Sequence, residues 1–170
     1  MLSSKTLWAG TSVAVAFALA ISPGFGREQR SKVELPAAVV RSVMDNCPNA
    51  EIAAVEVEKP GGVTLYDIEF KGGRGDIKVA EDGSVIDIAT IIKLKELPAA
   101  ALAAIQNAAP GATIKQVEKS EVRAEVIHGR VVKLARARVS YGAELVKGNQ
   151  HAEVQIALDG KVIEAPKWEN

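Results

Sequence analysis

The sequence predicts an α+β fold made of two tandem helix-plus-antiparallel-meander units, each with one helix packed on a three- or four-stranded sheet. Three observations lead to this prediction. The chain has 170 residues, enough for one ordinary domain or two small ones, and 48% of them are hydrophobic. A helical pattern followed by alternating strand patterns occurs twice. An internal repeat relates the two occurrences.

The first segment of the chain is typical of an export signal. A single charge, Lys5, precedes an apolar run of 15 residues from Leu7 to Ile21, shorter than the roughly 20 residues that span a bilayer. Ala18-Leu19-Ala20 fits the small-x-small rule for signal peptidase. We expect a signal peptide over 1–20 cleaved near Ala20, a linker over 21–33, a secreted or periplasmic location and no stable membrane span after cleavage. An uncleaved N-terminal anchor is the alternative.

The repeat defines the boundaries of the two units. Glu34-Leu35-Pro36-Ala37-Ala38 recurs 62 positions later at Glu96, with 10 identities in the 25 positions from 34 to 58. A second block, 76–87, matches 153–164 at an offset of 77 with 5 identities in 12 positions. The offset grows by 77 − 62 = 15, which indicates an insertion. We therefore predict repeat 1 over 34–92 and repeat 2 over 93–170, with the insertion at about 120–138.

Each unit begins with a predicted helix. A Leu-Pro pair starts it, because proline at the first helical position loses no hydrogen bond. Pro48 and Pro110 end the two helices, because the residue before proline avoids the α region. A spacing of three and four residues marks the core stripe, which we predict to consist of Val40, Val43 and Cys47 in the first helix and of Leu102, Ile105 and Ala109 in the second.

Strands follow each helix. Tyr66, Ile68 and Phe70 alternate with more polar residues, and Val154, Ile156 and Leu158 repeat the pattern in the second unit. Asp82-Gly83 and Asp159-Gly160 lie between apolar runs, which is a strong hairpin signal. The insertion is itself strand-like around His128-Gly129, which indicates an extra or elongated hairpin.

These motifs together resemble a known family. Leu-Pro-Ala-Ala, Pro-x-Ala-x-Ile-x-x-Val-Glu, Tyr-x-x-Glu and Asp-Gly-x-Val-Ile are similar to the signature of the PepSY-like family, also called putative beta-lactamase-inhibitor-like. The signature stands at 35–87 and again at 97–164, with Tyr141 and Glu144 in the second copy. The resemblance implies an exported bacterial protein of tandem helix-on-sheet units that binds or restrains another protein. Its signature positions form the scaffold, so it assigns no binding residue.

The composition limits the classes of function that the chain can have. The chain has 21 basic residues (Lys plus Arg) and 21 acidic residues (Asp plus Glu), so the basic excess that is typical of a nucleic-acid binder is missing. His128 and His151 fall in predicted hairpin turns without a nucleophile motif nearby, and Cys47 is the only cysteine. We expect Cys47 to be a small buried residue, with intermolecular pairing as the alternative. The sequence therefore predicts no enzyme, no cofactor, no metal and no nucleic-acid partner.

Acidic pairs occur at strand spacing. Glu56 with Glu58, and Asp67 with Glu69, would each share one strand face. Because an acid–base pair also needs a pocket and a shifted pKa, we expect these residues to line an exposed strand face.

Charge is divided unevenly between the two units. Residues 34–96 carry 7 basic and 12 acidic residues, a balance of −5, whereas residues 97–170 carry 10 and 8, a balance of +2. Basic residues gather in the insertion, where Arg136 and Arg138 share a strand face. We predict Arg123, Arg136 and Arg138 as protein-binding residues that steer an acidic partner. A solvated outer face, or docking on the acidic first unit, is the alternative explanation.

These observations predict an exported, non-enzymatic binding protein that inhibits or regulates an extracytoplasmic hydrolase. Its partner would be another exported protein. The alternative is a cell-envelope module that binds a small ligand or a metal, or senses stress.

Overall fold

A computed structural model describes residues 33–170, so the predicted signal peptide and residues 21–32 of the predicted linker lie outside the described residues. Two α-helices and eight strands follow one another in this part of the chain. They are α1 (Ala37–Asn46), β1 (Ile52–Glu58), β2 (Leu65–Phe70), β3 (Gly75–Ala80), β4 (Val85–Ile92), α2 (Ala99–Ala108), β5 (Thr113–Ile127), β6 (Arg130–Lys147), β7 (Gln150–Ala157) and β8 (Val162–Glu164).

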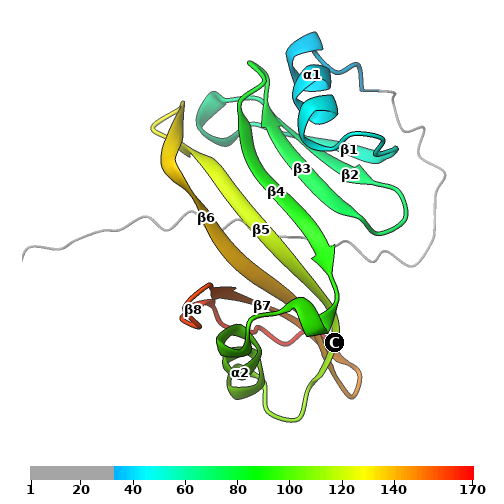
Figure 1. Cartoon of the computed structure of the whole chain (residues 1–170), viewed down its shortest axis with the longest axis vertical. Coiled ribbons are helices and arrows are strands. Elements are labelled where there is room, and N and C mark those ends of the chain that lie inside the picture. The colour runs from blue at the N-terminus through cyan, green and yellow to red at the C-terminus, as the bar shows by residue number, and fades with distance from the viewer. Residues whose placement is uncertain (1–32) are drawn as a thin grey trace, which may run out of the picture. The chain divides into compact units, whose positions relative to one another are not determined.

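The eight strands form one antiparallel sheet in the order β1 to β8 (Figure 1). β4 and β5 are hydrogen-bonded neighbours from the pair Ala89↔Ser120 to the pair Ile92↔Val117. The prediction of two helix-plus-sheet units is therefore wrong, because the sheet continues across the boundary between the sequence repeats. Pairing β4 with β5 satisfies two rows of backbone N–H and C=O groups that separate sheets would leave at free edges.

Both helices pack on the same face of this sheet. Below α1, Ile68, Ile77 and Ile88 are register partners across β2, β3 and β4. Ile92 lies four positions after Ile88 on β4, so it points to the same side. It pairs with Val117, which belongs to the core below α2. We call this side the helix face and the opposite side the open face.

The apolar alternation of the strands builds the core of the helix face. Tyr66, Ile68 and Phe70 are buried there, as their period of two predicts. Val154 and Ile156 are buried in the same way, whereas Leu158 lies beyond the end of β7 and is 57% exposed. Burial of each large side chain contributes about 1.5–3 kcal/mol to folding.

The helices begin directly after Pro36 and Pro98 and end two residues before Pro48 and Pro110, as the sequence predicts. The buried stripe is shifted by one position at its start. Val39 and Ala101 are fully buried, while Val40 and Leu102 are only half-buried. The reason is geometric, because residues spaced by four lie on one helix face as well as residues spaced by three.

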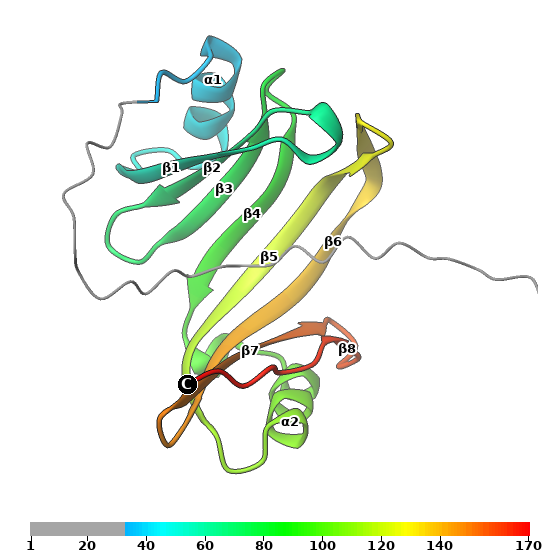
Figure 2. The ribbon, with the colours of Figure 1, turned by 180° about the vertical axis from the view of Figure 1, so that it is seen from behind.

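The sheet curls at one end so that the β1–β2 connection meets the tip of the β5–β6 hairpin (Figures 1 and 2). A Cβ atom built on Gly61 would lie 3.3 Å from the Cα atom of Gly129, so the two backbones touch. Below this contact is a small apolar cluster on the open face, formed by Leu65, Ala80, Ile86 and Ala124. The contact thus closes one end of the open face.

Candidate functional site: the open face of the sheet

The strand alternation that directs apolar side chains to the helices directs acidic side chains to the open face. The register aligns them across neighbouring strands: Asp67 pairs with Lys78, and Lys78 pairs with Asp87. Among the described residues neither helix covers this side. Its charged residues include Glu56, Glu58, Asp67, Glu69, Asp76, Lys78, Asp87, Glu118, Lys133, Arg138, Glu144, Glu153 and Glu164.

Lys78 is the buried cation of this face, with only 8% of its surface exposed. Its ammonium group lies 3.0 Å from Asp67 Oδ2 and 3.2 Å from Glu58 Oε2. Burial alone would lower the pKa of Lys78, but the two carboxylates outweigh burial and raise it. Lys78 therefore stays charged and offsets part of the negative charge on the β1–β2 side of the face.

Asp76, on the next row of the same face, is in the opposite situation. Burial, followed by repulsion from Asp67, Glu118 and Asp87, raises its pKa to about 8, although Lys78 acts in the opposite direction. This carboxyl group therefore carries a proton for most of the time at neutral pH.

The pKa values of two further carboxyl groups in the centre of the face are also raised. Burial raises the pKa of Glu118 to about 7, and the charges of Asp87 and Glu153 add to the effect. Burial also raises the pKa of Asp87. The hydroxyl of Ser120 donates a hydrogen bond of 2.8 Å to Asp87 Oδ1, which lowers that pKa, but burial has the larger effect. Crowded, partly dehydrated carboxyl groups thus surround the centre of the face.

The floor between these groups is made of small side chains. Ala89, Ser120, Ser140 and Ala157 are successive register partners from β4 to β7, and the first three are buried. We call these four residues the small-residue row. Two residues after Ser140 on β6, Gly142 lies under the side chain of Glu118: a Cβ atom built there would be 2.8 Å from Glu118 Oε1. The glycine therefore lets Glu118 lie flat against the sheet.

A shallow hollow of about 360 Å³ opens at the curled end of the molecule. Val63, Ala80 and Val131 contribute apolar wall, and Glu81 and Asp82 contribute carboxylates. It adjoins the apolar cluster under the β1–β2 connection.

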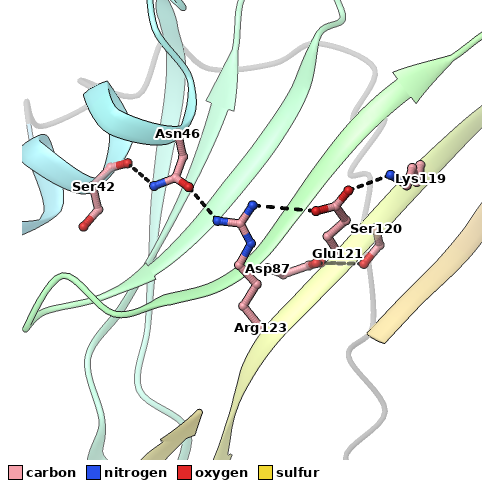
Figure 3. Close-up of polar contacts among 7 residues, drawn as sticks. All are labelled: Ser42, Asn46, Asp87, Lys119, Ser120, Glu121 and Arg123. Atoms are coloured by element: carbon pink, nitrogen blue, oxygen red, sulfur yellow. Dashed lines mark hydrogen bonds and ion pairs between the residues drawn. The ribbon is translucent and has the colours of Figure 1, made fainter. Parts of the chain in front are cut away.

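The three arginines predicted as binding residues do not gather into one site. Arg123 lies on the helix face, where its Nη1 donates a hydrogen bond of 2.6 Å to Asn46 Oδ1 of α1, and its Nη2 pairs with Glu121 (Figure 3). Arg138 is the register partner of Val122, next to Ser140 on the open face, and forms an ion pair with Glu125. Arg136 is exposed on β6.

The network around Arg123 connects β5 to α1. Lys119 donates to Glu121, Glu121 pairs with Arg123, and Asn46 donates in turn to the backbone oxygen of Ser42 (Figure 3). Hydrogen bonding to Lys119 lowers the pKa of Glu121. Arg123 is thus held between α1 and its neighbour Glu121 on β5, and its predicted role in binding stays a prediction.

Histidine and cysteine form no reactive group. His128 is at the tip of the β5–β6 hairpin with a positive φ of 49°, as its predicted turn position requires, whereas His151 lies within β7 beside Glu169. Across residues 33–170, no three His, Cys, Asp or Glu side chains are placed to hold a metal ion. Cys47 at the end of α1 is half-buried, and burial raises the pKa of its thiol.

Sequence reasoning singled out Asp67 and Glu69 but not the central residues Asp76, Asp87 and Glu118. The available signal was alternation with apolar neighbours: Asp76 precedes Ile77, Asp87 lies between Ile86 and Ile88, and Glu118 follows Val117. What alternation cannot provide is the register, which brings these three side chains from different strands to one place.

Neither a comparison with protein-family models nor one with curated proteins gives a match. Solved structures do show the fold. A BLIP-like protein from Bacteroides fragilis is 15% identical with a TM-score of 0.51, covering 80% of this chain and 87% of its own. A DUF2874 family protein from Bacteroides uniformis is 17% identical with a TM-score of 0.52, covering 78% and 88%. A candidate periplasmic protein from Bacteroides eggerthii is 16% identical with a TM-score of 0.53, covering 81% and 90%.

These neighbours support a BLIP-like fold, and they do not support the predicted assignment to the PepSY-like family in two tandem copies. In residues 33–170, neither helix has the length and apolar character needed to cross a membrane.

Proposed function

We propose that this chain is an exported, non-enzymatic protein that binds another exported protein through the open face of its sheet. A broad antiparallel sheet covered on one side only presents a fixed surface to a partner. The proposed periplasmic location is supported by the signal-like first segment and by the candidate periplasmic protein among the structural neighbours.

The observation that carries this proposal is the partial burial of carboxyl groups on the open face and the rise in pKa that it causes. Partial dehydration raises the pKa of Asp76 to about 8 and that of Glu118 to about 7, which destabilises the fold at neutral pH. A surface of purely structural importance gains nothing from this arrangement. Strongly perturbed titratable groups gather at functional sites, and here they lie on the one sheet face without a helix.

The finer form of the proposal is that binding inhibits or regulates an extracytoplasmic hydrolase. It is supported by the BLIP-like neighbour, whose fold is shared. Because fold transfers poorly to function, the proposal has to be tested on the partner itself. The exposed Arg136 remains a competing prediction for the binding surface, whereas the predicted binding residue Arg138 lies on the open face itself.

The test begins with capture of a partner. The chain without its predicted signal peptide is immobilised and exposed to the exported proteins of the organism that produces it, and the captured protein is purified. Its affinity is then measured for three variants: Asp67→Asn with Glu153→Gln on the open face, Arg136→Glu at the exposed basic position, and Asp45→Asn with Glu34→Gln as the control for removed charge.

We expect the open-face variant to weaken binding at least tenfold and the other two variants to change it less than threefold. Loss of binding only in the arginine variant would contradict the proposal and support the exposed Arg136 instead. Inhibition is tested by assaying the hydrolytic activity of the captured protein with and without this chain.

A further inference from the structure

The outer half of β6 is a free edge of the sheet. β7 pairs with β6 only from Ser140↔Ala157 to Lys147↔Gln150. Among the described residues, the segment 130–139 therefore has β5 as its only neighbouring strand (Figures 1 and 2). The backbone N–H and C=O groups on its outer side have no strand to pair with. Such an edge is a template for pairing with a strand of another chain.

β1 is the second long free edge. It is the first strand in the sheet order, and in the part of the chain that the structure describes it pairs only with β2. The opposite end of the sheet offers less, because β8 has only 3 residues and the backbone of Glu169 forms a bridge with His151 on β7. The two places where a long strand could be added are therefore β1 and the segment 130–139.

These two edges carry opposite charges. The segment 130–139 has no acidic residue, and its basic residues are Arg130, Lys133, Arg136 and Arg138. Of these four, only Arg138 has an ion-pair partner among residues 33–170. β1 has no basic residue and carries Glu56 and Glu58, and Glu51 directly precedes it. Charge complementarity therefore favours pairing of one edge with the other and disfavours pairing of either edge with itself.

We propose that this chain associates with itself head to tail, and that β1 of one copy pairs as an added strand with residues 130–139 of a second copy. The inference goes beyond the proposed function, because the contact lies at the edges of the sheet and the occupant is a second copy. The 7 residues of β1 fit beside the free segment of β6 without displacing β7.

The contact also covers apolar surface. Val57 on β1 is 40% exposed and Val132 on β6 is 42% exposed. Cross-strand apolar pairs and pairs of opposite charge both stabilise a sheet. Because the two edges differ, the contact is heterologous, so each copy in a pair keeps one edge free for the next copy.

The experiment measures self-association of the chain without its predicted signal peptide. Sedimentation equilibrium from about 10 μM to about 1 mM covers the range of a weak contact. We expect the average mass to exceed that of the monomer and to rise with concentration. It should fall when salt is raised to about 0.5 M, because salt screens exposed charges. Backbone NMR resonances within 52–58 and 130–139 should shift over the same range of concentration.

Two variants, each with a reversed edge, test the pairing. Lys133→Glu with Arg136→Glu gives the chain two acidic edges, and Glu51→Lys with Glu56→Lys gives it two basic edges. Each variant alone should associate at least about tenfold more weakly than the wild type, because like charges then face each other. Mixing the two variants should restore association, with the same resonances shifted.

The control keeps both edges and changes the net charge elsewhere. Glu34→Lys with Asp45→Lys alters exposed acidic residues outside both edges and should associate like the wild type. The NMR spectra report whether each variant is folded. A monomeric wild type at every concentration, undiminished association of either edge variant alone, or no recovery on mixing would each overturn the inference.

Failure of this inference is distinguishable from failure of the proposed function. Partner binding is measured on open-face residues, whereas self-association is measured on the two edges without any partner present. If Arg136→Glu weakens self-association and leaves affinity for the captured partner unchanged, the two surfaces are independent. If the chain is monomeric but the captured partner depends on open-face residues, only the self-association proposal is wrong.

Discussion

Two neighbouring rows of the same sheet show how differently its two faces are built. On the helix face, Ile68 and Ile77 pair in a row that is fully buried below α1. One position away on the open face, Asp67, Lys78 and Asp87 form a charged row without a helix above it. The first row lowers the free energy of the fold by removing apolar surface from water. The second row keeps charges partly dehydrated, and within the protein only the pairs of Lys78 with Asp67 and Glu58 offset that cost.

The difference teaches that only one face of this sheet is optimised for stability. Its other face holds carboxyl groups at a cost in folding free energy. The following predictions test this contrast, from the largest expected effect to the smallest.

Leu145 and Glu144 are adjacent on β6 and point to opposite faces, so they form a matched pair. Leu145 is fully buried below α2, and Leu145→Ala should reduce the free energy of unfolding by about 2–5 kcal/mol. Glu144→Ala should change it by less than about 1 kcal/mol. Chemical denaturation of both variants measures the contrast, and equal losses would show that the two faces do not differ as described.

Lys78 tests the ion cluster on the open face. Lys78→Met keeps most of the side-chain volume but leaves Asp67 and Glu58 without their cation, so it should cost about 2–3 kcal/mol at neutral pH. Lys71→Met, which breaks the exposed pair with Glu51, is the control and should cost less than about 0.5 kcal/mol. If the two substitutions cost the same in urea denaturation, Lys78 is not an effectively buried cation.

Asp76 should make the stability of the protein depend on pH. Its folded pKa of about 8 lies above the value of 3.8 for an exposed aspartate, so the folded state binds the extra proton between these values. Stability from this group is therefore fully present below about pH 4 and declines as pH rises to about 8. Asp76→Asn should remove this decline and raise the free energy of unfolding at pH 8 by at least about 1 kcal/mol.

The check on Asp76 is a series of denaturation curves from pH 5 to pH 9 for the wild-type chain and the variant. Parallel pH profiles of the two proteins would show that Asp76 is not protonated in the folded state.

A substitution at Gly142 tests why the pKa of Glu118 is raised, and it has the smallest expected effect on stability. In Gly142→Ala the new Cβ atom would approach Glu118 Oε1 to 2.8 Å, so the flexible glutamate side chain has to move outward. The pKa of Glu118 should then fall from about 7 toward its ordinary value of 4.5. Stability should change by less than about 1 kcal/mol. A carboxyl-carbon NMR titration measures the pKa, and an unchanged value would mean that packing on Gly142 does not cause the shift.

The local features of the fold were predictable because they depend on neighbouring residues. Proline positions determined where the helices begin and end, and Asp82-Gly83 and Asp159-Gly160 determined two hairpin turns, in which an aspartate side chain accepts the N–H of Ser84 or Lys161. The continuous sheet was not predictable in this way, because pairing of β4 with β5 joins residues on either side of α2.

The same limit applies to the candidate site. Alternation around Asp67 and Glu69 predicted an exposed acidic strand face, but the charge repulsion of Asp76 and Asp87 with Glu118 depends on the register of three strands. Basic residues in the insertion drew attention to Arg123, although that arginine is held by Asn46 and Glu121 on the helix face. Net charge along the sequence does not reveal which charges already have partners.

The most direct test of the central claim, that a partner binds the open face, is photo-crosslinking in the organism that produces the protein. A benzophenone amino acid is placed singly at Gln155 on the open face, at exposed Ala103 on the outer side of α2, and at exposed Arg136. The account predicts a defined protein adduct from position 155 and none from position 103. Adducts from position 103 or 136 with none from position 155 would contradict it.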